Sequence, residues 1–167
     1  MSAAAAPSLR VGLGFDVHAF GGDGPLVLGG VTIADGPSLS GHSDADVVAH
    51  AVADSLLGAA GLPDLGTLFP ASDDQYRGAS SIVLLSDVVT RVAQAGWRVG
   101  NVDVVIAADR PQLGEHVAAM GACLGDVVNA PVSVKPKRTE GVGAIGRGEG
   151  IAAWAVALLL REVGSDG

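Results

Sequence analysis

The sequence is poor in cysteine and in aromatic residues. Its single cysteine, Cys123, excludes an internal disulfide bond, which suits a reducing compartment. Aromatic residues contribute only 4% of the chain, so the core must be built mainly from Val, Leu, Ile and Ala. The longest apolar run extends from Ile151 to Leu160, whereas a transmembrane helix needs about 20 residues. We therefore expect no association with a membrane.

Positive charge is also scarce. The chain has 10 Lys and Arg residues against 18 Asp and Glu residues, and its net charge of −8 argues against a nucleic-acid partner. The few cations are unevenly placed, since Lys135, Lys137, Arg138 and Arg147 lie within one short window. Cations concentrated in an acidic protein predict a site for a small anion there.

The N terminus lacks a basic region and a long apolar stretch, so neither a signal peptide nor a transit peptide is predicted. We expect a disordered tail over residues 1–9, one domain over residues 10–162 and a second tail over residues 163–167. Hydrophobic residues, at 49% of 167 positions, suffice for the core of one such domain. The short neutral N terminus favours a location in the bacterial cytoplasm.

Residue periodicity predicts the first elements of structure. Alternating residues from Val11 to Asp16 predict a half-buried strand, and a glycine turn leads to a returning strand over residues 25–31. Ser43 and Asp46 resemble a helix-capping pair, and the helix that follows extends to about Gly61. The core stripe expected on that helix consists of Val48, Val52, Ser55, Leu56 and Ala59.

The rest of the chain alternates between predicted helices and strands. We expect a loop over residues 63–72, a helix over 80–95, a strand over 99–107, a helix over 111–129, a strand over 132–135 and a helix over 149–162. The inward side of the helix over 80–95 is expected to carry Val83, Leu84, Val88, Val92 and Ala95. This order predicts an α+β fold, with a mixed four-stranded sheet, helices on one face and an N-terminal hairpin.

The predicted closing helix has no polar side between Ile151 and Leu160. A helix that is apolar all round is buried on all sides. In a domain of this size the second cover could be another subunit, so the pattern predicts an oligomer.

Three of the four histidines lie in one stretch of forty residues with several aspartates. Asp16 and His18 point to the same side of a strand, and His50 shares a helix face with Asp46 and Asp54. Two imidazoles and a carboxylate form the ligand set of an open divalent-metal site, and Asp54 could orient an imidazole from behind. The alternative is a set of ordinary surface or core polar residues.

Two further segments could bind an anion. His42 and Ser43 lie at the start of a helix, where free backbone N–H groups bind anions; Ser43 could equally be only an N-cap. Residues 135–150 are either a mobile glycine loop or a phosphate-binding loop, in which Glu140 suits magnesium. Together these segments suit phosphate chemistry but name no substrate.

Several motifs occur together and in order over residues 10–160. They are Gly14-Phe15-Asp16-Val17-His18, Gly41-His42-Ser43-Asp44-Ala45-Asp46 with His50, Asp64-Leu65-Gly66 with Phe69-Pro70, Gly100-Asn101-Val102-Asp103, and Gly146-Arg147-Gly148-Glu149-Gly150. In this the chain resembles the 2-C-methyl-D-erythritol 2,4-cyclodiphosphate synthase family.

The resemblance implies an α+β homotrimer with an active site at each subunit junction. The substrate would be 4-diphosphocytidyl-2-C-methyl-D-erythritol 2-phosphate, whose 2-phosphate attacks the β-phosphate, closes a cyclic diphosphate and expels CMP in non-mevalonate isoprenoid biosynthesis. Asp16, His18 and His50 would hold one zinc ion per subunit, and Glu140 would bind a second divalent ion, magnesium or manganese. In some members an axial channel beside Arg147 and Glu149 binds an isoprenoid diphosphate.

The resemblance also assigns residues to the substrate. His42 and Arg138 would be catalytic. The substrate-binding residues would be Asp16, His18, His42, Ser43, Asp64, Leu65, Gly66, Phe69, Asp73, Ala108, Asp109, Arg110, Pro111, Gln112, Leu113, Gly114, Lys137, Arg138, Thr139, Glu140 and Arg147. Those in residues 108–114 and 137–140 would hold the cytidine diphosphate, with residues 137–140 coming from a neighbouring subunit.

The chain departs from the family pattern in the basic loop. Arg138 stands where the family commonly has a threonine, and Pro136 stands where alanine is usual. Ala144 replaces a larger apolar residue near the channel, and Ala71 replaces a frequent acid. Two other functions remain open: a zinc-dependent phosphohydrolase that uses water as nucleophile, and a non-enzymatic trimeric metal-binding module.

Overall fold

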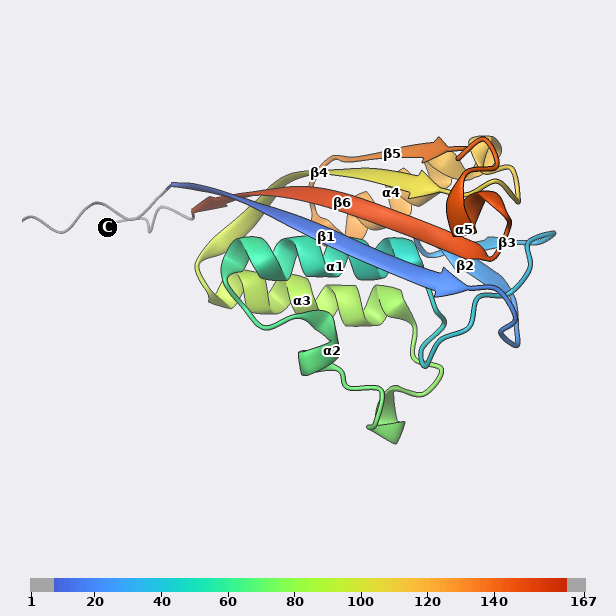
Figure 1. Ribbon diagram of the computed structural model, residues 1–167. Coiled ribbons are helices and arrows are strands. Elements are labelled where there is room, and N and C mark those ends of the chain that lie inside the picture. The colour runs from blue at the N-terminus through green and yellow to red at the C-terminus, as the bar shows by residue number, and fades with distance from the viewer. Residues whose placement is uncertain (1–7, 162–167) are drawn as a thin grey trace, which may run out of the picture.

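A four-stranded sheet in the order β1-β6-β4-β5 forms one layer of the computed structural model, which describes residues 8–161 (Figure 1). The β1/β6 and β6/β4 pairs are antiparallel and the β4/β5 pair is parallel, which confirms the predicted mixed sheet. The strands are β1 (Leu9–Ala19), β2 (Leu26–Leu28), β3 (Val31–Ile33), β4 (Trp97–Ala107), β5 (Val132–Lys137) and β6 (Gly150–Arg161).

The helices are α1 (Val47–Ala60), α2 (Leu65–Leu68), α3 (Ser81–Gln94), α4 (Val117–Val128) and α5 (Gly143–Gly146), with 3-10 turns η1 (Asp74–Tyr76) and η2 (Gly114–His116). Figure 1 shows α1 and α3 side by side along one side of the sheet. Of the predicted tails, residues 1–7 and 163–167 lie outside the described residues, and Leu9 begins β1. Within residues 8–161, the helices are too short or too polar to span a membrane.

The predicted closing helix is wrong, because residues 150–161 form β6, which pairs with both β1 and β4. The small residues Ala153, Ala155 and Ala157 are buried, while Trp154 and Val156 are exposed. This is the two-residue period of a strand. Because both faces of β6 are apolar, its sequence shows no alternation of polar and apolar residues that would identify a strand. The argument for an oligomer from an all-round apolar helix is therefore lost.

The N-terminal hairpin differs from the prediction. The strand expected over residues 25–31 is interrupted at Gly29 and Gly30, both of which have positive φ. Its two halves belong to a separate small sheet in which β2 and β3 pair with each other. Positive φ is accessible to glycine at little cost, so this pair makes the tight turn and ends the strand early.

Three further predictions need correction. The predicted loop over residues 63–72 contains α2, whose N-cap is Asp64. The helix expected from Pro111 begins only at Val117, after the 3-10 turn η2. On α3, Leu84, Val88 and Val92 are buried as predicted, but Val83 and Ala95 are exposed.

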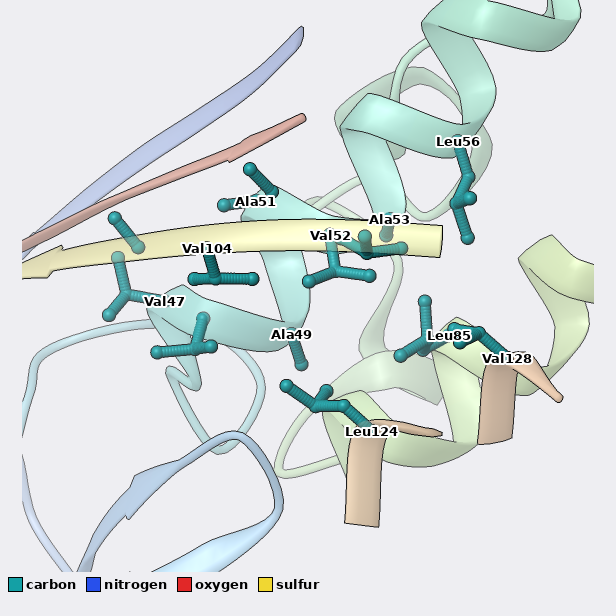
Figure 2. Packing of buried hydrophobic residues seen from close by; sticks show 14 of the residues in the cluster. Val47, Ala49, Ala51, Val52, Ala53, Leu56, Leu85, Val104, Leu124 and Val128 are labelled. Atoms are coloured by element: carbon teal, nitrogen blue, oxygen red, sulfur yellow. The ribbon is translucent and has the colours of Figure 1, made fainter. Parts of the chain in front are cut away.

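The core lies between the sheet and the helices. Figure 2 shows Val52 and Leu56 of α1 grouped with Val104 of β4, Leu85 of α3 and Leu124 of α4. All five residues of the core stripe predicted on α1 are buried. Because α1 packs against both β1 and β6, its position on the sheet is fixed by these contacts.

The opposite face of β1 and β6 is apolar and uncovered in the single chain. We call it the open face and define it by Val11, Leu13, Phe15, Trp154 and Val156, all of which are exposed. The rings of Phe15 and Trp154 lie 5.0 Å apart across the two strands. Gly12 and Gly14, which alternate with these residues along β1, face α1 and lie on the buried side of the strand.

Candidate metal centre and adjoining pockets

Asp16, His18 and His50 meet where the end of β1 passes the first turns of α1. Asp16 Oδ2 lies 3.0 Å from His18 Nε2 and 2.9 Å from His50 Nδ1, and the two nitrogens are 3.3 Å apart. The three ligand atoms all lie within 4.8 Å of one another. The geometry confirms that these three predicted ligands can reach one ion.

Asp46 fixes the start of α1. It is the N-cap, in place of the predicted Ser43, and its carboxylate accepts hydrogen bonds from the backbone N–H groups of Val48 and Ala49. The same fully buried carboxylate accepts from Gly29 N at 2.8 Å and Gly30 N at 2.7 Å, which ties the hairpin turn to the helix. Asp46 therefore has a structural role and lies outside the ligand set.

The electrostatics of the centre favour charge separation between Asp16 and His18. Burial alone raises the pKa of Asp16, but hydrogen bonds from His18 and His50 outweigh it and hold that pKa well below its usual range. The hydrogen bond to Asp16 raises the pKa of His18, although burial opposes this. A cation placed among the three groups would take over the role of the imidazole protons.

Each imidazole is also held from its far side. His18 Nδ1 lies 2.6 Å from the carbonyl oxygen of Ser40, and His50 Nε2 lies 2.8 Å from Ser81 Oγ and 3.2 Å from Ser43 Oγ. Asp54 does not orient a ring, since it accepts a hydrogen bond from Leu65 N at 2.8 Å. Burial raises the pKa of Asp54, and the Leu65 hydrogen bond opposes the rise.

Ser81 and Asp44 take part in this arrangement, although residue spacing did not single them out as site residues. Ser81 is the first residue of α3 and is buried, and its hydroxyl and backbone N–H both donate to the Asp44 carboxylate. The contact between Ser81 and His50 spans 31 residues. No local pattern in the sequence reports a contact over that distance. Asp44 entered the sequence analysis only as a member of the motif Gly41–Asp46.

A pocket of about 290 Å³ opens beside the centre. Its lining includes the three candidate ligands together with His42, Ser43, Asp54, Leu65, Gly66, Phe69, Ala71, Tyr76 and Leu84. Polar groups therefore cluster at the centre, and apolar groups line the rest. Asp64 and Asp73 do not line it. They cap α2 and η1, although the backbone oxygen of Asp73 lies 3.2 Å from His42 Nε2.

A second pocket of about 220 Å³ lies at the C-terminal ends of the parallel strands β4 and β5. Its lining consists of Ala108, Asp109, Pro111, Gln112, Leu113, Gly114, Pro136, Lys137 and Arg138. The structure thus brings most of residues 108–114 together with part of the basic loop within one chain. Arg110 instead lies over the ring of Phe20.

Asp109 links the two segments of the second pocket. Its Oδ2 accepts a hydrogen bond from Thr139 Oγ1 at 2.5 Å, and its Oδ1 lies 3.7 Å from Arg138 Nε. The Thr139 hydrogen bond, aided by Arg138, keeps the pKa of Asp109 below its usual range. Among the described residues, buried Oδ1 of Asp109 has no hydrogen-bond partner, so it leaves an acceptor free at the pocket wall.

Glu140 and Arg147 stand apart from the metal centre. Glu140 is exposed and has positive φ (54°), and Arg147 Nε is 2.7 Å from Glu149 Oε1. Within residues 8–161, the one group of three or more residues able to gather around a metal ion is Asp16, His18 and His50. Their two imidazole nitrogens and one carboxylate oxygen suit zinc, and three protein ligands leave a position open.

Fold and site thus define an α+β protein with a candidate metal centre that borders a pocket. Comparison with known proteins gives the family. Residues 9–160 match the model of the YgbB family. The chain is 52% identical over 155 residues to a 2-C-methyl-D-erythritol 2,4-cyclodiphosphate synthase from Bordetella petrii, covering 91% of this chain and 96% of the relative. An Edwardsiella ictaluri protein of the same name is 48% identical and covers 92% and 100%. The chain belongs to the YgbB family.

Solved structures agree with this assignment. A synthase structure described as a CDP-bound form has a TM-score of 0.81 at 36% identity, covering 90% of this chain and 99% of the other. A CDP complex of the Plasmodium falciparum protein has a TM-score of 0.80 at 31% identity, covering 93% and 98%. The α+β fold with its mixed sheet and small hairpin is therefore that of the family.

Proposed function

We propose that the chain converts 4-diphosphocytidyl-2-C-methyl-D-erythritol 2-phosphate to 2-C-methyl-D-erythritol 2,4-cyclodiphosphate and CMP. Its curated relatives are named as synthases of this cyclodiphosphate. The chain is then a lyase of non-mevalonate isoprenoid biosynthesis. The observation that carries this function is the Asp16, His18 and His50 group, which faces the pocket with one side open. The predicted bacterial cytoplasmic location stays a prediction.

Asp16, His18 and His50 would hold zinc, which when bound supplies Lewis-acid polarisation of a phosphate oxygen. His42 and Ser43 border the same pocket and would position the 2-phosphate and take up charge on the phosphate in transfer. Leu65, Gly66 and Phe69 form the apolar wall and would enclose the methylerythritol. Confining the 2-phosphate beside the β-phosphate favours ring closure over attack by water.

The second pocket would hold the cytidine diphosphate end. Two solved relatives are described as CDP-bound, and backbone from residues 108–114 with Lys137 and Arg138 suits a nucleotide diphosphate in size and charge. Thr139 positions Asp109 behind this site. Glu140 would add a carboxylate for magnesium or manganese, a coordination completed by phosphate oxygens.

The active assembly would be a homotrimer that buries the open face. Exposed Leu13, Phe15 and Trp154 form an apolar patch on two adjoining strands, the kind of surface that marks a protein interface. The second pocket, with the loop from Lys137 to Glu140, would then complete the active site at the metal centre of a neighbouring subunit. The exposed Arg147–Glu149 pair would lie at the axis, beside a channel that could take an isoprenoid diphosphate.

Phosphorus NMR on the proposed substrate tests the function directly. With zinc and magnesium present, we expect a cyclic diphosphate and stoichiometric CMP, and neither with His50→Ala. Linear phosphates from the wild-type protein would instead show a zinc-dependent phosphohydrolase. Zinc bound without any turnover would show a non-enzymatic metal-binding module.

A further inference from the structure

The far side of His50 is held by a chain of hydrogen bonds from three separate segments. Asp44 lies in the loop before α1, His50 in α1, and Ser81 begins α3. The Ser81 hydroxyl donates to Asp44 Oδ1, and Ser81 N donates to Asp44 Oδ2 at 3.0 Å. Ser81 Oγ then lies 2.8 Å from His50 Nε2. Both oxygens of Asp44 are therefore engaged by the same serine.

The chemistry of these groups fixes the direction of each hydrogen bond. A carboxylate has no proton to donate, so the Ser81 hydroxyl must give its single proton to Asp44. Ser81 Oγ then presents only lone pairs toward His50, and Nε2 must be the donor. A protonated ring donates from both nitrogens, to Asp16 through Nδ1 and to Ser81 through Nε2. A neutral ring carries one proton, and the acceptor-only Ser81 oxygen keeps that proton on Nε2, so Nδ1 then turns its lone pair toward Asp16 and His18.

We propose that Asp44 and Ser81 are positioning residues that lock His50 in the Nε2–H tautomer and set its ring rotation, so that Nδ1 is ready to bind the metal ion. This inference rests on the proposed function only in its choice of zinc as the ion. Ser81 is buried, so water does not compete for its oxygen. Ser43 Oγ, at 3.2 Å from Nε2, is a weaker second contact.

The first measurement is the ring tautomer of His50 in metal-free protein, read from imidazole nitrogen NMR shifts at about pH 9, where an ordinary histidine is neutral. We expect Nε2–H in the wild type and a mixture of tautomers in Ser81→Ala. Asp44→Ala, which frees the hydroxyl proton to point at Nε2, should give the same mixture. This second variant keeps the test valid if one of the two does not fold.

The second measurement is zinc affinity by competition with a chelator. Ser81→Ala should weaken binding about 10- to 100-fold, the usual effect of losing a partner behind a metal-bound histidine. Ser81→Thr, which keeps the hydroxyl, should restore most of the affinity. Ser80→Ala is the matched control, since Ser80 is exposed and makes no side-chain cap. Turnover of Ser81→Ala should need correspondingly more zinc and recover when zinc saturates.

Wild-type tautomer and zinc affinity in folded Ser81→Ala would overturn the proposal. A shifted tautomer and weakened zinc binding would support it even if the wild-type protein formed no cyclic product, and that result would contradict only the proposed function. Turnover that stays low at saturating zinc would also count against it, because a positioning residue acts through metal occupancy.

Discussion

A Cβ atom added to Gly14 would lie 1.9 Å from the carbonyl oxygen of Ala51, because α1 rests directly on the backbone of β1. Gly12, two residues earlier, meets Ser55 in the same way, with its added Cβ 2.0 Å from the Ser55 carbonyl oxygen. These two glycines allow the helix to approach the strand closely enough for His50 to reach Asp16 at 2.9 Å. The close approach is therefore part of how the metal centre is built.

Gly14→Ala should push α1 away from β1. We expect a loss of about 1–3 kcal/mol in the free energy of unfolding, as for other overpacked sites, and weaker zinc binding. Urea denaturation and a zinc titration measure the two effects. Gly58→Ala, in the same helix but with nothing within 4 Å of its added Cβ, should cost no stability. Equal stability of the two variants would contradict the account of the close approach.

Zinc affinity should rise with pH. The hydrogen bond to Asp16 raises the pKa of His18 above the ordinary histidine value of about 6.5, against the opposing effect of burial, so metal-free protein keeps this proton where the unfolded chain has lost it. That stabilisation is fully present below about pH 6.5 and is lost as pH rises through the raised pKa. Zinc needs the neutral ring, so its affinity increases over the same window.

Zinc titrations at a series of pH values, with thermal unfolding of the metal-free protein, measure this linkage. In Asp16→Asn the window should move down toward the ordinary histidine range, and affinity should fall because a ligand is lost. An affinity that stays constant through the window would show that His18 does not exchange a proton for the ion.

Asp46→Ala should destabilise the fold. It would leave the buried N–H groups of Gly29, Val48 and Ala49 and the partly buried N–H of Gly30 without their acceptor. We expect a cost of at least about 2 kcal/mol, since each unsatisfied buried group costs about 1–3 kcal/mol. Asp64→Ala is the control, because the only backbone N–H that donates to the side chain of this exposed cap, among the residues that the structure describes, is that of Thr67. Chemical denaturation of both variants compares them, and similar losses would contradict the role given to Asp46.

Arg138→Thr should lower kcat/KM by about tenfold or more. The arginine borders the second pocket, and a hydrogen bond from it to a charged substrate phosphate would contribute about 1.5–3 kcal/mol. Arg98→Thr, an exposed arginine on β4, should leave kcat/KM unchanged. Steady-state kinetics with CMP release as the signal distinguish the two. An increase in turnover would show that the arginine obstructs the pocket.

Leu13→Lys should break the assembly. It places a charge in the centre of the open face, where Leu13 is 67% exposed in the single chain. Sedimentation velocity should shift from a trimer to a monomer at micromolar concentration. Val83→Lys, which changes an apolar residue of α3 that is 65% exposed, should remain trimeric. If the wild-type protein sediments as a monomer, the proposed trimer is wrong.

The grouping of the three candidate metal ligands could be predicted because short-range rules place each of them on its strand or helix. Asp16 and His18 share a strand face, and His50 lies one turn into a helix whose buried stripe is plain in the sequence. Only the meeting of strand and helix had to be assumed. Spacing also offered Asp46 and Asp54 on the helix face, but their oxygens turn to backbone N–H groups instead.

β6 could not be predicted in the same way. Alanine has high helix propensity, and the alternation of alanine with larger residues from Ala153 to Leu158 is invisible to a polar/apolar pattern. Pairing with strands on both sides decides its conformation, and that information lies more than 40 residues away in the chain, in β1 and β4. The start of α1 was misplaced because Ser43 and Asp46 are both good caps, and only the hairpin turn selects Asp46.

The two pockets have different linings, one built from β1 and α1 and the other from the ends of β4 and β5. If one substrate spans a pocket from each of two subunits, substitutions in the two pockets should complement each other when they lie on different chains. Mixing a chain altered at His50 with a chain altered at Arg138 would then reconstitute some intact junctions. Two inactive preparations that regain turnover after co-refolding would reveal active sites shared between chains.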